Sequence, residues 1–348
     1  MEDYRKKRRE QTRSRRYRKG RITAVFLIVF IVGAGSGVGM NVLMGKPRVQ
    51  KARPSTSDTS PKETTGTTGK KTKKTTSKAV PLVFDTPTAM SHVFALSEQI
   101  GPRPAGSVRE ADAANYIVGK LGEYGYTVED QSFTTADGFG SRNIVGTRRG
   151  TRSGYDIVLG AHYDSSTQAK GAVDNASGVG VVLELARVLS ATRLEPTIRF
   201  VFFGANRPGA TNMDDRLQGS RRYVDMLGSM ERKDILGMIC VDSVGQGEQL
   251  ALRTQESGLQ RLKTKLETFG RENNIPTTVL KAVADSDNMP FENAGVPAVW
   301  IEWCDAGGKL VTDDRYNSVM PGKVEIAGNL VLNFLLDLRP DDLEELKY

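Results

Sequence analysis

Apolar and polar residues follow three different patterns along the 348-residue chain. Residues 22–44 carry no charge, and at about 1.5 Å of rise per residue a helix of that length crosses a hydrocarbon core of roughly 30 Å. Residues 45–79 are rich in Thr, Ser, Lys, Pro and Gly and nearly lack large apolar side chains. We therefore expect a basic tail at 1–21, a transmembrane helix at 22–44, a disordered linker at 45–79 and a globular domain at 80–348.

Helical and strand periodicities alternate within the globular domain, a pattern typical of an α/β fold. Apolar runs predict strands at 126–133, 142–147, 156–161, 197–203, 237–242 and 297–303. Helical spacing predicts helices at about 107–121, 175–190, 217–229, 257–274 and 322–338. A capping box of Ser107 and Glu110 opens the first of these helices. The domain should therefore form a largely parallel central sheet with helices on both faces.

Charge is distributed unevenly over these segments, although the whole chain carries a formal net charge of +8. Residues 1–21 hold 11 basic and 3 acidic residues, residues 46–79 hold 10 and 2, and residues 80–348 hold 28 and 36. The folded part is acidic, which argues against a nucleic-acid-binding domain. By the positive-inside rule, the basic tail predicts a single-pass protein of the cell membrane with an extracytoplasmic carboxyl-terminal domain. The basic linker could then contact an anionic envelope surface.

A cleaved signal peptide is the alternative interpretation of the first apolar segment. Its apolar core would be residues 22–32, and its small-residue cleavage region would be residues 33–37. The apolar stretch continues through residues 42–44, which favours a retained anchor. A disulfide between Cys240 and Cys304 is permitted outside the cytoplasm, but both positions also suit small buried side chains, so the sequence leaves this question open.

Residues 160–177, with the sequence GAHYDSSTQAKGAVDNAS, carry the candidate chemistry of the domain. His162, Asp164 and Asp174 follow one predicted strand, and Asp242 lies at the end of another. Ligand sites of open α/β sheets gather at the carboxyl ends of the strands. Because an imidazole and carboxylates that converge on one point suit a borderline-soft divalent ion, the pattern predicts the metal site of a metallohydrolase.

Several segments together resemble metallopeptidase family 28, the secreted or membrane-bound di-zinc aminopeptidases. These segments are IGPRPAGS (100–107), GAHYDSS, VDNASGVGVVLELARVL, TIRFVFFGA, LQGSRRYV, the strand ending at Asp242, and SDNMPFENAGVPAV. They occur in the family's order and cover almost all of residues 88–338. The resemblance implies a zinc exopeptidase-like fold with a mixed sheet of about eight strands between helices.

The resemblance also implies roles for individual residues. His162, Asp174 and Asp242 match the family's first zinc half-site, in which the residue at Asp174 bridges two ions. Asp164 matches the carboxylate that orients the ligand imidazole. Asn206 replaces the family's general base, so the proton acceptor of the reaction is missing.

The second zinc half-site departs from the family. Arg207 stands in place of a glutamate ligand, and Asn317 stands in place of the last histidine ligand. A guanidinium cannot coordinate a metal, but it could place its charge where zinc would have been and pair with Asp174. These replacements leave room for one zinc ion and disfavour a second.

A second alignment register would recruit Asp214 and Asp215, which precede LQGSRRYV, as general base and metal ligand. This register requires a gap ahead of the GS motif, and aspartate is one methylene shorter than glutamate. Asn317 would still remove a ligand, so the register with Asn206 and Arg207 is favoured. The alternative role for Asp214 and Asp215 is a solvated loop or a helix amino terminus.

Three functions remain open at this point. The first is a membrane-tethered aminopeptidase relative that is weak or inactive as a peptidase and binds a peptide, a protein or an envelope partner. The second is an active mono-zinc metallopeptidase that cleaves amino-terminal residues from peptides. The third is an envelope scaffold in which the basic linker binds. Asn206, Arg207 and Asn317, which together stand in place of the family's general base and two ligands, favour the first function. His92 is predicted to be structural.

Overall fold

The computed structural model describes residues 82–348 except 208–209, 211, 213–214, 256, 282–285 and 311–312. The predicted basic tail, transmembrane helix and linker lie outside these residues. Within the part of the chain that is described, no helix is both long enough and apolar enough to cross a membrane.

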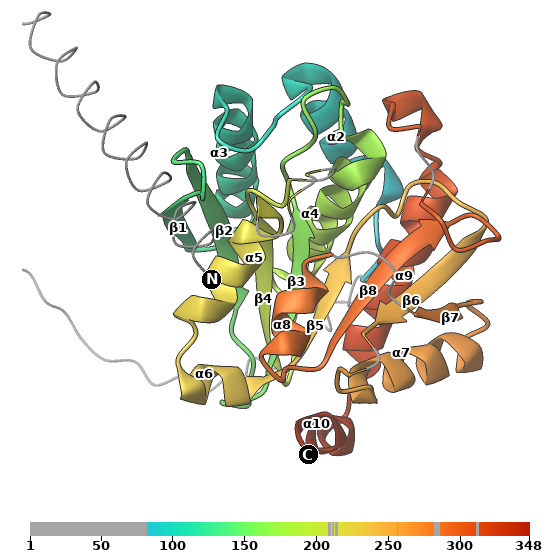
Figure 1. The fold of residues 1–348 in the computed structure, drawn as a ribbon. Helices are drawn as coiled ribbons and strands as arrows, with labels where there is room; N and C mark the ends of the chain where they lie inside the picture. The colour runs from blue at the N-terminus through green and yellow to red at the C-terminus, as the bar shows by residue number, and fades with distance from the viewer. Residues whose placement is uncertain are drawn as a thin grey trace, which may run out of the picture. The chain divides into compact units, whose positions relative to one another are not determined.

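Eight strands form one mixed sheet with helices on both of its faces (Figure 1). The strands are β1 (Val128–Thr134), β2 (Gly140–Arg148), β3 (Asp156–His162), β4 (Thr197–Phe203), β5 (Ile235–Val241), β6 (Gln249–Thr254), β7 (Thr278–Lys281) and β8 (Ala298–Cys304). Their order across the sheet is β1-β2-β4-β3-β5-β8-β6-β7. The four central strands run parallel, whereas β1, β2 and β6 introduce antiparallel pairs. The mixed sheet expected from the sequence is therefore confirmed.

The centre of the sheet is apolar because helices cover it on both sides. Every residue of β3, β5 and β8 is buried, as the continuous apolar runs of these strands indicate. All six strands that the sequence located are present, with ends within two residues of the predicted ones.

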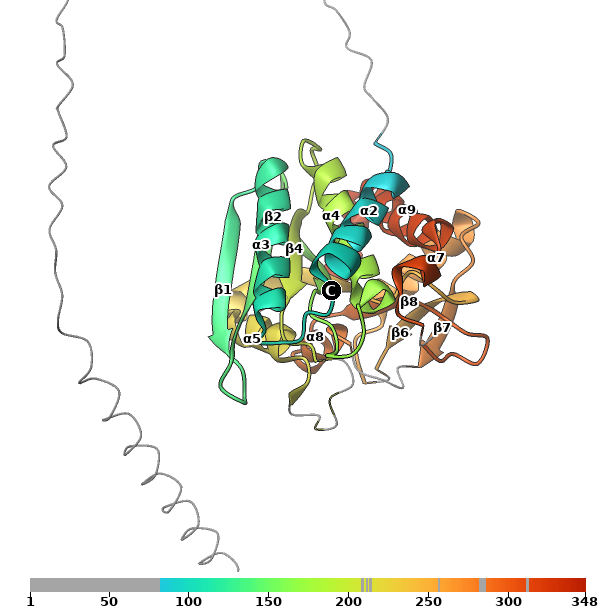
Figure 2. The same cartoon turned by 90° about the horizontal axis from the view of Figure 1, so that it is seen from above.

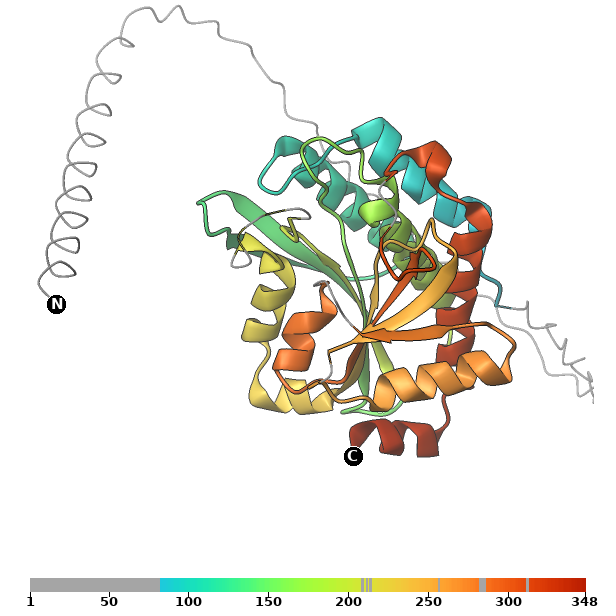
Figure 3. The ribbon, with the colours of Figure 1, turned by 45° about the vertical axis from the view of Figure 1, so that its right-hand side comes forward.

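The sequence did not locate β6 and β7, which Figure 3 brings forward together with α7 (Arg261–Glu272). β7 has only four residues, and its side chains alternate between half-buried and exposed positions at the edge of the sheet. A strand this short gives no periodic signal that distinguishes it from a loop.

Helices lie on both faces of the sheet (Figure 2). The buried apolar side chains form two clusters, one on each face. The remaining helices are α2 (Thr86–Phe94), α3 (Val108–Glu123), α4 (Gly178–Leu189), α5 (Gln218–Met226), α6 (Ser229–Asp234), α8 (Asn288–Asn293), α9 (Pro321–Asp337) and α10 (Pro340–Lys347), with shorter turns η1 (Ala95–Ile100), η2 (Ala172–Ser177) and η4 (Tyr316–Ser318). The larger cluster includes side chains of α2, α3, α4, α7 and α9. The smaller one lies under α5 and α8, where the rings of Phe203, Tyr223 and Phe291 contact one another.

The predicted capping box of α3 is formed only in part. Ser107 Oγ accepts a hydrogen bond from the Glu110 amide at 3.1 Å, as expected. The Glu110 carboxylate does not return to Ser107; it accepts from Gly106 N at 2.6 Å, Ser141 Oγ at 2.7 Å and Ala205 N at 3.0 Å. Burial raises the pKa of Glu110 to about 7. Glu110 therefore supports the loop that follows β4 as well as the start of α3.

The burial of apolar side chains gives a first testable prediction. Leu159 in β3 is fully buried, whereas Leu259 is 42% exposed. Leu159→Ala should lower the free energy of unfolding by about 2–5 kcal/mol because it removes apolar contacts and leaves a cavity. Leu259→Ala, the matched control, should change it by about 0.5 kcal/mol or less. Urea unfolding followed by the fluorescence of the buried Trp300 and Trp303 measures both. Equal destabilisation by the two variants would contradict this view of the core.

Candidate metal centre

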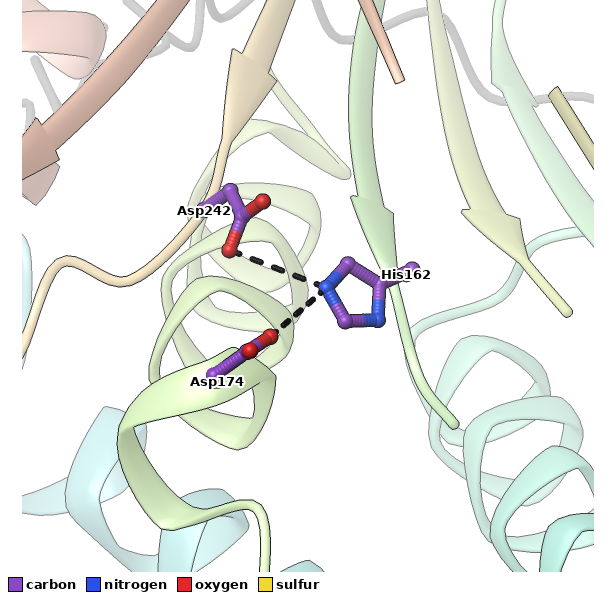
Figure 4. A group of neighbouring side chains, drawn as sticks. All are labelled: His162, Asp174 and Asp242. Carbon is purple, nitrogen blue, oxygen red and sulfur yellow. Dashed lines mark ion pairs between the residues drawn. The ribbon is translucent and has the colours of Figure 1, made fainter. Parts of the chain in front are cut away.

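Three neighbouring segments carry the candidate ligands at the carboxyl edge of the sheet (Figure 4). His162 is the last residue of β3, and Asp242 directly follows the last residue of β5. Because β3 and β5 pair in parallel, their carboxyl ends meet at the same edge. Asp174 lies in η2, on the connection from β3 to α4. The structure thus brings together residues that are up to 80 positions apart in the sequence.

The ligand atoms of the three side chains converge. His162 Nε2 lies 3.0 Å from Asp174 Oδ1 and 3.7 Å from Asp242 Oδ1. One ligand atom from each residue lies within 4.8 Å of the other two. The His162 side chain is 1% exposed and that of Asp242 10%, whereas that of Asp174 is 36% exposed. One imidazole and two carboxylates in this arrangement are a donor set that suits zinc, with access from the side of Asp174.

Asp164 orients the imidazole and joins the loops that follow β3 and β4. Its buried carboxylate lies 3.4 Å from His162 Nδ1, so Nε2 is left facing the other two carboxylates. The same carboxylate accepts hydrogen bonds from the backbone amides of Asn206 at 2.9 Å and Arg207 at 2.8 Å. The backbone at Asn206 and Arg207 is therefore tied to the histidine through one side chain.

The carboxylates also control the charge of His162. Burial lowers the pKa of His162, but the charge of Asp242 and the hydrogen bonds with Asp164, Asp174 and Asp242 outweigh burial and raise this pKa well above 6.5. Burial works against the ionised form of Asp242, but the charge of His162 and the hydrogen bonds from His162, Ser286 and Ser243 together outweigh burial and lower the Asp242 pKa. Without a metal ion, the cluster therefore holds a proton on the imidazole.

Asn175 fixes the position of Asp174 relative to Asp242. Its Nδ2 donates to the carbonyl of Val241 at 2.9 Å, and its Oδ1 accepts from the amide of Ser243 at 3.2 Å. These bonds lie on either side of Asp242 in the chain, so one buried amide holds two ligand loops together. Sequence reasoning did not single out Asn175, although its place beside Asp174 in DNAS was a signal.

Two further residues fasten the loop that carries Asp174, and sequence reasoning missed the role of both. The buried guanidinium of Arg103 donates to backbone carbonyls around this loop, including that of Gly171 at 2.8 Å. Asp314 Oδ1 accepts from the Asp174 amide at 3.0 Å. Burial lowers the pKa of Arg103 to about 10 and raises that of Asp314 to about 6. No local pattern marked them, because they lie far from Asp174 in the sequence.

The side chain of Asn206 contacts the buried carboxylate of Asp287. Its Nδ2 donates to Asp287 Oδ2 at 3.2 Å, and both residues are buried. Within the described part of the chain, Asp287 Oδ1 has no hydrogen-bond partner. Burial raises the pKa of Asp287 to about 6, and the charge of His162 opposes part of this rise. Asp287 directly precedes α8 and lies within electrostatic reach of His162 and Asp242.

The prediction that Arg207 pairs with Asp174 is wrong. Arg207 Nη2 donates instead to Asp137 Oδ1, in the turn between β1 and β2. The cause lies in the backbone, because Arg207 has a φ of 58° and its amide is bound to Asp164. With the backbone fixed in this way, the side chain extends toward the β1–β2 turn, and its charge does not take the place of a metal ion.

The other candidate residues lie outside the cluster. Asn317 is exposed in η4, which packs against η2. Asp215 is half-buried just before α5, and among the described residues only His162, Asp174 and Asp242 form a group able to hold a metal. Asp214 lies outside the described residues. Cys240 and Cys304 are both buried free thiols, so the two cysteines do not form a disulfide in this structure.

His92 has the structural role that the sequence predicted. Its Nδ1 lies 2.6 Å from the hydroxyl of Tyr116, and its Nε2 lies 3.1 Å from that of Tyr124. Burial lowers the pKa of His92 to about 4, so the ring is neutral at pH 7.

Fold and cluster together define an α/β protein of the metallopeptidase type. Residues 143–335 match the model of peptidase family M28. The chain belongs to this family.

Curated relatives include leupeptin-inactivating enzyme 1 of Streptomyces exfoliatus, 30% identical over 200 residues, and aminopeptidase YwaD of Bacillus subtilis, 30% identical over 203 residues. These alignments cover 57% and 55% of this chain. They span only 43% of the length of each relative.

Solved structures share the fold. A zinc aminopeptidase from Bacillus subtilis matches with a TM-score of 0.67 and 20% identity, over 74% of this chain and 96% of its own. A glutaminyl cyclase from Porphyromonas gingivalis matches with a TM-score of 0.64 and 22% identity, over 74% of this chain and 99% of its own. Because two activities occur on one fold, the function of this chain must be argued from its site.

The buried carboxyl of Asp287 gives a second testable prediction, on the pH dependence of the stability of the metal-free protein. The folded pKa of Asp287, about 6, lies above the ordinary aspartate pKa of 3.8, so the unfolded state loses this proton first and folding stability falls as pH rises from about 4 to 6. Asp287→Asn should remove on the order of 3 kcal/mol of that fall. Urea unfolding at a series of pH values measures it. Asp112→Asn, an exposed carboxylate on α3, is the control, and equal slopes in wild type and Asp287→Asn would contradict the assignment.

Proposed function

We propose that the domain holds one zinc ion through His162, Asp174 and Asp242 and binds peptides there, with weak or no hydrolysis. The observation that carries this proposal is the 3.0 Å and 3.7 Å approach of two carboxylates to one buried imidazole nitrogen. Membership of family M28 and the names of the relatives, an aminopeptidase and a leupeptin-inactivating enzyme, support a peptide ligand.

The donor set fits one ion better than two. Three protein ligands and an open position are a usual arrangement for zinc outside purely structural sites. Bound zinc supplies a Lewis acid that polarises a carbonyl group or a water molecule. No second group of acidic, histidine or cysteine ligands lies beside the first among the described residues. The remaining task of the chain is to orient His162 through Asp164 and to hold Asp174 through Asn175, Arg103 and Asp314.

Weak hydrolysis follows from the side chain at position 206. An amide cannot accept a proton from an attacking water, and the Asn206 amide already donates to Asp287. General acid–base catalysis typically contributes about a hundredfold to ten-thousandfold to a rate. Peptide binding needs no such group, so binding survives the replacement while turnover falls.

An active mono-zinc aminopeptidase is the second candidate, and Asp287 favours it. This carboxylate is fully buried, and its Oδ1 has no hydrogen-bond partner within the described part of the chain. Its pKa, raised to about 6 by burial, suits a group that takes up a proton near neutral pH. Asp287 would then serve as the proton acceptor in place of the residue at 206.

We also propose that residues 22–44 anchor the chain in the cell membrane, with the domain outside the cytoplasm. The uncharged segment and the dense arginine and lysine residues ahead of it support this orientation. The basic residues at 46–79 would keep the domain near an anionic envelope surface.

Metal analysis of the full chain after dialysis against zinc gives a third prediction. We expect one zinc per chain, lost in His162→Ala and bound about 10–100-fold more weakly in Asp164→Asn, because Asp164 orients the ligand ring. Asn317→Ala, at an exposed position outside the cluster, is the control and should keep the ion. Zinc that is retained by His162→Ala would place the metal elsewhere and reject the proposal.

A gain-of-function variant gives a fourth prediction. Asn206→Glu, Arg207→Glu and Asn317→His together should raise zinc to two per chain and increase hydrolysis of an amino-terminal chromogenic amide at least about a hundredfold, since they return a proton acceptor and two ligands. The matched control places Gln at all three positions. Strong, chelator-sensitive turnover by the wild type would reject the proposal that hydrolysis is weak or absent. It would favour an active mono-zinc aminopeptidase.

A further inference from the structure

A cavity of about 480 Å³ opens beside the candidate metal centre. Four loops line it: the segment before α3, the β1–β2 turn, the loop after β3 and the loop after β4. Ser165, which directly follows Asp164, and Arg207, which directly follows Asn206, both belong to the lining. Two loops therefore contribute residues both to the surroundings of the metal centre and to the lining of this cavity.

Among the described residues that line the cavity, Arg207 and Asp137 carry charge, and they form an ion pair with each other. The other described lining residues have small, hydroxyl or amide side chains, together with one proline. Within the described lining, a ligand thus meets one cation, Arg207, whose competing anion is Asp137.

The guanidinium of Arg207 has donors to spare. It presents five N–H groups in a rigid fork. The Arg207 side chain is only 17% exposed, and its buried Nε has no hydrogen-bond partner within the described part of the chain. A planar fork of this kind matches a carboxylate, which can accept two parallel hydrogen bonds from it.

Asp137 is a weak competitor for that fork. Its side chain is 42% exposed on a turn, and exposed ion pairs contribute little to stability. Arg207, by contrast, is fixed by the bond from its amide to Asp164 and by its φ of 58°. A carboxylate that enters the cavity can therefore compete with Asp137 for a guanidinium that extends from a fixed backbone.

We propose that this cavity binds an acidic side chain of a peptide whose neighbouring residue lies at the metal centre. The ligand class is then a peptide with a glutamate or aspartate next to the bound residue. This inference rests on the proposed function, because the metal centre holds the other part of the peptide. Arg207, which stands where the family has a glutamate ligand, would then recognise an anionic side chain of the peptide.

Titration calorimetry of the full chain with two peptides tests this inference. The probes are the tripeptide amides Ala-Glu-Ala and Ala-Gln-Ala, which differ by one charge at nearly equal size. At low salt the zinc-loaded wild type should bind the Glu peptide about tenfold or more tightly, as expected for hydrogen bonds to a charged group. Arg207→Gln should remove this preference, Arg207→Lys should keep part of it, and Asp137→Asn should strengthen it because the competing anion is gone.

Arg109→Gln, which removes an exposed arginine of α3, is the matched control and should leave the preference unchanged. Equal affinity of the wild type for both peptides, no binding of either peptide, or a preference that persists in Arg207→Gln would each overturn the inference. Zinc content is measured on the same samples. If the protein binds zinc but binds both peptides equally, this inference alone is rejected. If the protein takes up no zinc, the proposed function is rejected. The comparison of the two peptides with the metal-free protein then still decides the role of Arg207.

Discussion

One buried carboxylate, that of Asp164, connects the parts of this molecule on which its function depends. It lies 3.4 Å from His162 Nδ1 and accepts the backbone amides of Asn206 and Arg207. The first contact turns the other ring nitrogen of His162 toward Asp174 and Asp242. The second pair of contacts fixes the backbone from which Asn206 reaches Asp287 and Arg207 reaches Asp137. The candidate metal ligand His162 and the loop that carries Asn206 and Arg207 thus share one anchor.

The proposed function separates binding from catalysis. The candidate ligands lie where two parallel strands end, and Asn175, Arg103 and Asp314 hold their loops. The loop after β4 offers the amide of Asn206 and the guanidinium of Arg207, which donate hydrogen bonds and do not act as proton acceptors. Under the proposal, bound zinc on one side and these donors on the other would hold a peptide. The proposal leaves Asp287 as the carboxylate to weigh in any hydrolytic role.

The sequence predicted the fold and the ligand triad because both depend on strong local signals. Six strands were located within two residues, and His162, Asp174 and Asp242 lie at or beside strand ends and in a recognisable motif. β7 was missed because a run of four residues, alternately half-buried and exposed, is too short to distinguish from a loop. Arg207 was placed wrongly because its direction depends on a positive φ and on Asp164, neither of which a sequence pattern encodes. The supporting roles of Arg103, Asn175 and Asp314 were missed for a related reason, since their hydrogen-bond partners are distant in the chain.

The number and position of bound metal ions test the central claim most directly. Anomalous diffraction at the zinc edge, from crystals of the protein grown with zinc, would locate each ion without assumptions about ligands. We expect one peak that contacts His162, Asp174 and Asp242, with the Arg207 guanidinium directed away from it toward the β1–β2 turn. Two peaks roughly 3.5–4 Å apart, with Asp174 between them, would contradict the half-retained site.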